Sequence, residues 1–138
     1  MSDTNTSRRT ITMTDRPPVT ISEEQWPLIA TARETEHDGQ VECQANRRSK
    51  WFVGVRQHDD GRAIVYATYS YSTHWQGERD YGAKRGVMLP INSDVTSVIA
   101  AIRDVCADIS DAECADGDAG RWQTLAAECI ADMPAEEV

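Results

Sequence analysis

The sequence contains no long apolar run. Its 138 residues hold no stretch close to the roughly 20 apolar residues that a membrane-spanning helix needs. We therefore expect no transmembrane helix and no membrane partner. The N-terminal segment MSDTNTSRRTITMTDRPP has two adjacent arginines but no apolar segment after them. This pattern argues against a secretory signal and favours a cytoplasmic location.

Paired metal ligands are also missing. The sequence has four cysteines and three histidines, but no two cysteines are spaced as C-x-x-C and the histidines are scattered. A structural zinc site uses paired ligands at short spacing, so none is predicted. The Asp116-Gly117-Asp118 segment lacks the residue order of a calcium-binding EF-hand loop. We predict no metal, no cofactor and reduced cysteines, with Cys106 and Cys129 as small core residues.

Catalytic motifs are absent as well. The sequence has no Gly-x-Ser-x-Gly elbow, P-loop, Rossmann glycine pattern or His-Glu-x-x-His motif. His58 beside Asp59 and Asp60 occupies an exposed turn, where nothing would exclude water, and His74 occupies a polar segment. A His–carboxylate pair can act as a general base, but no nucleophile, base and orienting group can be assembled here. The sequence therefore predicts a protein that is not an enzyme.

What the sequence does have is charge sorted by position. Residues 44–86 carry a net charge of +4, residues 87–138 carry −9, and residues 21–43 carry −5, within a total of −9. A cationic segment rich in aromatic residues thus lies between two anionic segments. Because charge distribution bears on partners more than on fold, this pattern is the main clue to function.

The N-terminal third is expected to contain an arm and a helix. Residues 1–19 are polar and end in two prolines, which predicts a flexible arm before a single domain over residues 20–138. Ser22 with Gln25 three residues later has the form of a capping box, so we expect a helix over residues 23–35, although Pro27 fits it poorly. Residues 41–45 are a candidate short strand.

The middle and C-terminal segments predict a sheet and two helices. Two β-rich runs flank the Asp60-Gly61 pair and predict a hairpin over about residues 51–72, followed by a loop over 73–84 and a strand over 86–89. Apolar residues at helical spacing predict one helix capped by Ser93 or Asp94 and a second over about 122–133. The fold class is α+β: a three- to four-stranded antiparallel sheet packed on two or three helices, in the order α-β-β-β-α-α.

The cationic segment supplies a candidate binding face. Cations contact phosphates and flat rings stack on unpaired bases, so the segment suits nucleic acid. The alternative is a solvated face whose arginines pair with the acidic helices, and the pI of about 4.7 favours it. The candidate residues are Arg47, Arg48, Lys50, Arg56, Arg62, Tyr69, Tyr71 and Trp75.

The acidic C-terminal half has two interpretations. A rigid array of carboxylates can imitate DNA phosphates and occupy a basic cleft on another protein. The other interpretation is an ordinary solvated helix face with an acidic loop, which is what charge runs usually are. The carboxylates concerned are Asp104, Asp108, Asp111, Glu113, Asp116 and Asp118.

Three stretches resemble a family of uncharacterised small proteins from proteobacterial plasmids and integrated mobile elements. They are TISEEQWP at 20–27, VRQHDDGRAIVY at 55–66 and CIADMPAE at 129–136. The resemblance implies a bacterial accessory setting and carries over no site residue. We therefore predict an acidic accessory protein that acts by protein–protein contact, as a regulator or inhibitor. Nucleic-acid binding through residues 47–85 is the alternative, and opposed charged faces on one domain also favour a homo-oligomer.

Overall fold

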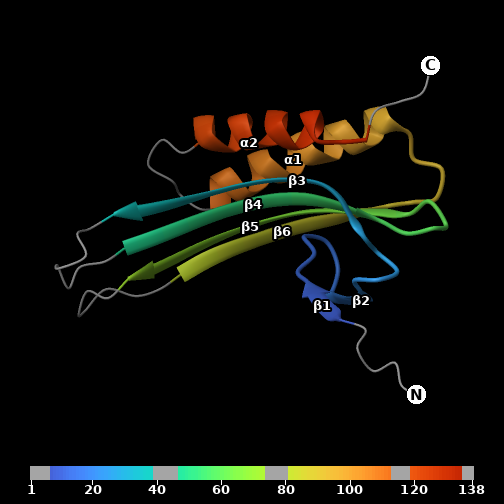
Figure 1. The fold of residues 1–138 in the computed structure, drawn as a ribbon, viewed down its shortest axis with the longest axis horizontal. Helices are drawn as coiled ribbons and strands as arrows, with labels where there is room; N and C mark the ends of the chain where they lie inside the picture. The colour runs from blue at the N-terminus through green and yellow to red at the C-terminus, as the bar shows by residue number, and fades with distance from the viewer. Residues whose placement is uncertain (1–6, 39–46, 74–80, 113–118, 135–138) are drawn as a thin grey trace.

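The structure, a computed structural model, describes residues 7–38, 47–73, 81–112 and 119–134. These residues form an α+β fold of six strands followed by two helices (Figure 1). The fold class is as predicted, but the order α-β-β-β-α-α is wrong because the described chain begins with strands. The elements are β1 (Arg8–Ile11), β2 (Val19–Ser22), β3 (Leu28–Asp38), β4 (Arg47–Gln57), β5 (Ala63–Thr73), β6 (Tyr81–Leu89), α1 (Val95–Ala112) and α2 (Ala119–Ala131).

The main sheet is an antiparallel meander in the order β3-β4-β5-β6. The predicted hairpin is confirmed as β4 and β5, which pair from Arg47↔Thr73 to Gln57↔Ala63. The turn between them closes with a hydrogen bond from the His58 amide to the Arg62 carbonyl (2.9 Å). Gly61 has a φ of +96°, in the left-handed region that favours glycine, so the Asp-Gly signal marks a real turn.

The strand after this hairpin is longer than the sequence suggests. Residues 81–84, expected in a loop, pair with β5 as the first half of β6. At Gly82 a β-carbon would lie 2.6 Å from the Tyr69 carbonyl oxygen, so only glycine allows this close pairing. The glycine that indicated a loop therefore serves the strand. The strand expected over residues 41–45 lies outside the described residues.

Both helices cover one face of the main sheet (Figure 1). Their apolar stripes are as predicted: Ile102, Ile109, Leu125 and Cys129 are fully buried. They pack against the alternate sheet residues that face them, which are Ala30, Ala32, Trp51, Val53, Val55, Val65, Ala67 and Tyr69. The Ser97 amide donates to Asp94 Oδ1 (2.9 Å), so Asp94 caps α1. No helix within the described ranges is long and apolar enough to cross a membrane.

The helix expected over residues 23–35 is wrong. The Gln25 and Trp26 amides both bond the Ser22 carbonyl (3.1 and 3.0 Å), which makes a turn, and β3 starts at Leu28. Pro27 has no backbone N–H to donate within a helix. The backbone groups of the residues after it form hydrogen bonds with β4 instead. Tertiary pairing therefore overrides the capping-box pattern.

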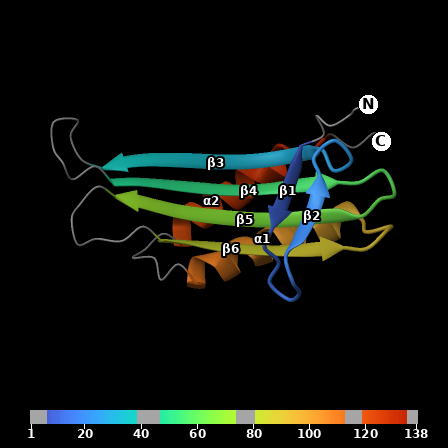
Figure 2. The same ribbon diagram turned by 90° about the horizontal axis from the view of Figure 1, so that it is seen from below.

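A second small sheet lies on the other face. The hairpin of β1 and β2 crosses one end of the main sheet (Figure 2). It buries Ile11, Met13 and Ile21 against Trp26, Ile64 and Tyr66. Residues 7–19, which we expected in a flexible arm, are therefore part of the folded domain, because their few apolar side chains complete this second core. No other element of the described residues covers the rest of that face of the sheet.

Arg56 fastens the hairpin to the sheet. Its side chain is buried, yet each guanidinium nitrogen has a partner: Nε donates to the Tyr66 hydroxyl (2.9 Å), Nη1 to the Trp26 carbonyl (3.0 Å) and Nη2 to Glu23 Oε2 (3.2 Å). Glu23 Oε2 also accepts a bond from Arg9 Nε on β1 (2.7 Å). That hydrogen bond holds the pKa of Glu23 below its usual value, so this carboxylate stays ionised until the pH falls through the lowered pKa.

The two helices each contribute one buried thiol to the core. Cys106 and Cys129 are 2% and 0% exposed, as predicted from their places on the apolar stripes. Burial raises the pKa of both thiols from 9 to about 12. At neutral pH they are inert small core residues rather than nucleophiles.

Replacing Arg56 should show how much the fold depends on it. Arg56→Met leaves the Trp26 carbonyl and the Tyr66 hydroxyl without a donor, and breaking such a buried network typically costs about 3–5 kcal/mol. Arg56→Lys keeps the charge but cannot reach three acceptors in one plane, so we expect a loss of about 1–3 kcal/mol. Urea unfolding measures both. Arg62→Lys, at a surface ion pair, is the matched control and should change stability by no more than about 0.5 kcal/mol. Equal effects of the two lysine substitutions would contradict this role.

The buried thiols predict a loss of stability in alkali. Because their pKa is higher in the folded chain than in the unfolded chain, their contribution is complete below pH 9 and is lost as the pH rises from 9 to about 12. Each thiol adds at most about 1.4 kcal/mol per pH unit to the slope. The Cys106→Ala, Cys129→Ala double variant should be less stable at pH 7 but have a shallower decline above pH 9. Parallel declines in urea unfolding would refute the assignment.

Candidate functional site

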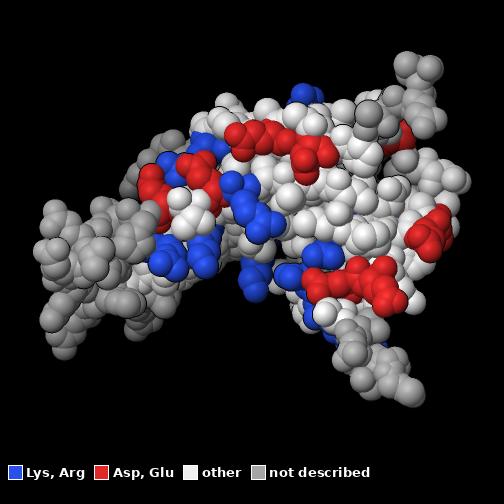
Figure 3. All heavy atoms as spheres, viewed as in Figure 1, with Lys and Arg blue, Asp and Glu red and all other residues white. Residues whose placement is uncertain are grey.

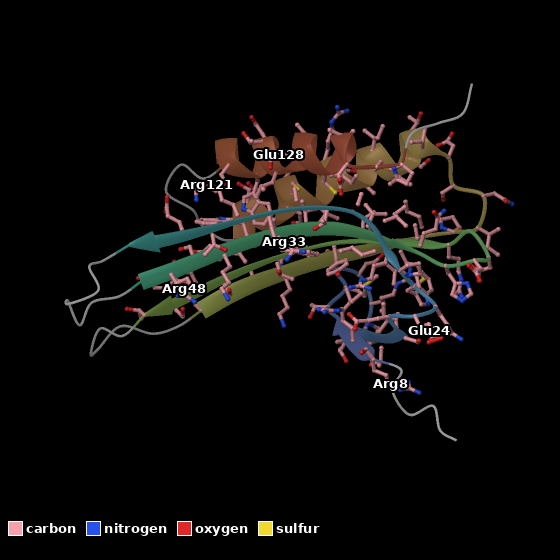
Figure 4. The ribbon with its side chains drawn as sticks, in the orientation of Figure 1. Arg8, Glu24, Arg33, Arg48, Arg121 and Glu128 are labelled. Carbon is pink, nitrogen blue, oxygen red and sulfur yellow. The ribbon has the colours of Figure 1, made fainter. Side chains whose placement is uncertain are left out.

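The uncovered part of the main sheet carries the candidate site. Side chains alternate between the two faces of a strand, so the residues next to the helix-facing ones in sequence point to the opposite face. On that face, beyond the β1–β2 hairpin, lie Arg33 on β3, Arg48 and Lys50 on β4, and Lys84 on β6. We call these four residues the cationic face. Arg33 and Arg48 lie on the side of the sheet that faces away from α2 and its Glu128 (Figure 4).

Strand register fixes how these cations are spread. One row across the sheet runs from Arg33 through Phe52 and Thr68 to Lys84. The next row brings Lys50 between Thr35 and Ser70. Since neighbouring strands are about 4.8 Å apart and successive rows about 7 Å apart, the four cations span an area of about 15 by 14 Å. Hydroxyl groups fill the spaces between them.

A groove separates the cationic face from the β1–β2 hairpin. It has a volume of about 460 Å³ and is lined by Arg9 on the hairpin side, by Arg33, Lys50, Thr68 and Ser70 on the sheet side, and by Glu34 of β3. The partly buried Phe52 ring lies among them, and the Arg33 guanidinium lies over it at 5.7 Å. Figure 3 shows Lys and Arg spheres along this lower side of the sheet, and Asp and Glu spheres over the helices and near the hairpin.

The cationic face is not neutralised within the described part of the chain. None of its four residues forms an ion pair there, and no described carboxylate belongs to the same face of β3–β6. Arg9, by contrast, is paired with Glu23. Arg33 and Lys50 line the groove, and Arg48 and Lys84 belong to the same face outside it, so the positive charge of this face is left without a carboxylate of its own among the described residues.

Two basic residues near the helices, Arg85 and Arg121, are paired with carboxylates. Arg85 Nε on β6 lies 3.4 Å from Asp108 Oδ2 on α1. Arg121 on α2 is stacked at 4.0 Å over the Trp51 ring and contacts Glu34 and Glu36 of β3 at 3.6 and 3.3 Å. The expected pairing of a basic sheet residue with an acidic helix residue therefore occurs at Arg85. At Arg121 the helix carries the positive charge and the sheet carries the negative charges.

Two of the eight predicted site residues, Arg48 and Lys50, lie on the cationic face. Arg56 lies on the same side of the sheet but is buried in its own network. Arg62 stays in the turn, where it pairs with Asp60 (2.8 Å) and lies over the Trp26 ring at 5.0 Å. Arg47 belongs to β4 but its side chain is outside the described part, as is Trp75.

The two predicted tyrosines are on the wrong face for a nucleic-acid site. Tyr69 is buried beneath the helices, 5.4 Å from the Trp51 ring, and bonds Ser49 Oγ at 3.2 Å. Tyr71 packs against the Tyr81 ring at 4.9 Å. The register puts Lys50 opposite Ser70, so the odd-numbered tyrosines of β5 must point the other way. The sheet thus separates these two tyrosine rings from Arg48 and Lys50.

Sequence reasoning missed Arg33 and Phe52. Arg33 falls within the segment wrongly predicted as a helix, and Phe52 falls within a segment whose composition predicts only a strand. The alternation of side chains along a strand could have identified both residues. The register places them on the same face of the sheet as Lys50 and Thr68. The pairing of Arg33 with Phe52 needs the β3–β4 register, which no local pattern supplied.

The acidic candidates that the structure describes lie on α1, and His58 belongs to the β4–β5 turn. Asp104 and Asp111 are exposed on α1, whereas Glu113, Asp116 and Asp118 lie outside the described residues. His58 Nδ1 accepts a bond from the Asp60 amide (3.1 Å), and its ring packs on Trp26, so it serves the turn. Within the described ranges no three side chains of His, Cys, Asp or Glu are grouped to hold a metal ion.

The arrangement can bind an anion by charge and hydrogen bonding, but it offers no activated nucleophile. The only described cysteines are buried with a raised pKa, and His58 is engaged in its turn. Comparison with protein-family models, with curated proteins and with solved structures gives no match for this chain.

Proposed function

We propose that this chain is a non-enzymatic binding protein that docks an acidic partner protein on its cationic face. The observation that carries the proposal is the cluster of Arg33, Arg48, Lys50 and Lys84, which has no ion-pair partner among the described residues in a chain of net charge −9. Folding normally distributes charges among opposite ones, so an unpaired cluster of one sign is suited to an external anion.

A protein partner is favoured over nucleic acid for two reasons. The rings that would stack on bases, Tyr69 and Tyr71, lie on the opposite side of the sheet, and Phe52 is only partly exposed. In addition, a net charge of −9 opposes the approach of a polyanion from a distance. An acidic patch or segment on a protein carries less charge and is repelled less.

The setting supports the same proposal. The resemblance of residues 20–27, 55–66 and 129–136 to small proteins of plasmids and integrated mobile elements suits an accessory regulator or inhibitor. Such a protein needs a surface rather than a catalytic centre. The proposed action is occupancy: the cationic face covers an acidic surface that the partner uses for something else.

Charge reversal on the cationic face tests the proposal. With fluorescent polyglutamate as the probe at low salt, Arg48→Glu with Lys50→Glu should weaken binding by more than about tenfold. It should also lower the slope of log affinity against log salt, because fewer ions are released. Fluorescence anisotropy measures both quantities.

The matched control is Arg16→Glu with Arg103→Glu, which makes the same change in net charge at two exposed residues away from the groove. It should bind polyglutamate nearly as the native chain does. Binding of single- or double-stranded DNA more tightly than polyglutamate, or no binding of polyglutamate at low salt, would overturn the proposal.

A further inference from the structure

The outer edge of β3 has backbone groups that no strand of the described residues pairs with. Figure 2 shows β3 at the margin of the main sheet. The Thr31 amide points away from β4 and donates to Asp132 Oδ2 (2.9 Å). Because outward and inward amides alternate along an antiparallel strand, the amides and carbonyls of Arg33 and Thr35 also point outward. Residues 33–36 are all exposed, so this edge is open to solvent.

The opposite edge of the sheet is protected instead. On β6 the Gly86 carbonyl accepts a bond from the Thr14 amide (2.8 Å), and the Gly86 amide bonds Thr14 Oγ1 (3.2 Å). The Lys84 carbonyl accepts a bond from Arg85 Nη1 (2.7 Å). Proteins usually cover an edge strand in this way to prevent unwanted pairing. Among the described residues, the β3 edge from Arg33 to Thr35 has no such cover.

We propose that the partner docks as an extended segment that adds a fifth strand to the β3 edge, with acidic side chains at alternate positions over the cationic face. This inference rests on the proposed binding of an acidic protein. In such a pairing the partner residue bonded to Arg33 has its side chain on the same face as the Arg33 guanidinium. Lys50 lies one strand further in, within reach of a long side chain.

The other face of the same edge sets a second requirement. Glu34 and Glu36 point to the helix side, where Arg121 lies 3.6 and 3.3 Å from them. A partner side chain beside them should be neutral or basic, because a third carboxylate would be repelled. The edge therefore favours a partner strand whose side chains alternate, with acidic residues on one face and non-acidic residues on the other.

The same two glutamates disfavour a second copy of this chain as the occupant. Antiparallel pairing of two β3 edges through Arg33 and Thr35 places Glu34 opposite Glu34 or Glu36 of the other copy. Like charges directly opposite each other are destabilising in a sheet. Charged edge residues commonly prevent self-pairing in this way. A foreign strand with the alternation described above meets no such repulsion.

The test compares backbone pairing with charge alone. The first probe is a labelled peptide of about seven residues with Glu at every second position and Thr between. The second probe is the same peptide N-methylated on each Glu, which removes the pairing amides and keeps the charge. We expect the N-methylated peptide to bind at least about tenfold more weakly in fluorescence anisotropy.

A matched pair of variants tests the edge from the other side. Thr35→Pro removes one outward amide without breaking a bond to β4, a substitution that edge strands tolerate. Thr35→Val changes the side chain but keeps the amide. Thr35→Pro should weaken the first probe about tenfold, while Thr35→Val should bind it nearly as the native chain does.

The outcomes separate the two proposals. If the Arg48→Glu, Lys50→Glu variant loses the peptide but N-methylation and Thr35→Pro have no effect, strand addition is refuted and charge-based docking stands. If the native chain binds no acidic peptide at low salt, both proposals fail. A dimer in size-exclusion chromatography with light scattering that Thr35→Pro converts to monomer would identify a second copy as the occupant and refute the foreign strand.

Discussion

The position of the site depends on the hydrogen bonds that the buried Arg56 guanidinium donates. Its three nitrogens each bond a different segment: the Glu23 side chain after β2, the Trp26 carbonyl before β3, and the Tyr66 hydroxyl in β5. A buried charge is tolerated only when it is fully paired, so these segments must meet at one place. The β1–β2 hairpin is thereby held at one end of the sheet, and no described helix or strand covers the other end on that face.

The remaining sheet divides its residues by strand parity. On β4, Trp51, Val53 and Val55 pack under the helices, so Lys50 and Phe52 between them must point to the opposite face. A slip of one residue against β5 would bury Lys50 and expose Trp51, at a cost of several kcal/mol in lost burial and unpaired charge. The apolar core thus fixes the position of every cation in the site, although none of them touches it.

The sequence predicted the elements that are determined by a local pattern of residues. The two helices and the β4–β5 hairpin follow from apolar spacing and the Asp60-Gly61 turn. The β1–β2 hairpin was missed because its strands are four residues long and carry too few apolar residues to show a period. The role of Ile11 and Ile21 as core residues becomes evident only from their packing on Ile64 and Tyr66. The helix expected at 23–35 failed for the same reason, since the pairing of β3 with β4 is not a local property. The site was predicted only as far as Arg48 and Lys50, because separating them from Tyr69 and Tyr71 needs the register.

Charge that is sorted along a sequence need not be sorted the same way on a surface. In β3 the segment Arg33-Glu34-Thr35-Glu36 has a net negative charge. Because side chains alternate between the two faces, Arg33 nevertheless lies on the open face, while Glu34 and Glu36 lie on the helix side. Arg121 from α2 then offsets one of those two negative charges, while Arg33 has no ion-pair partner among the described residues and lies on the same face as Lys50. The helices add acid to the far side of the sheet, where it is separated from the open face by the whole thickness of the core. An acidic protein can in this way present a basic face, provided that a sheet divides the two.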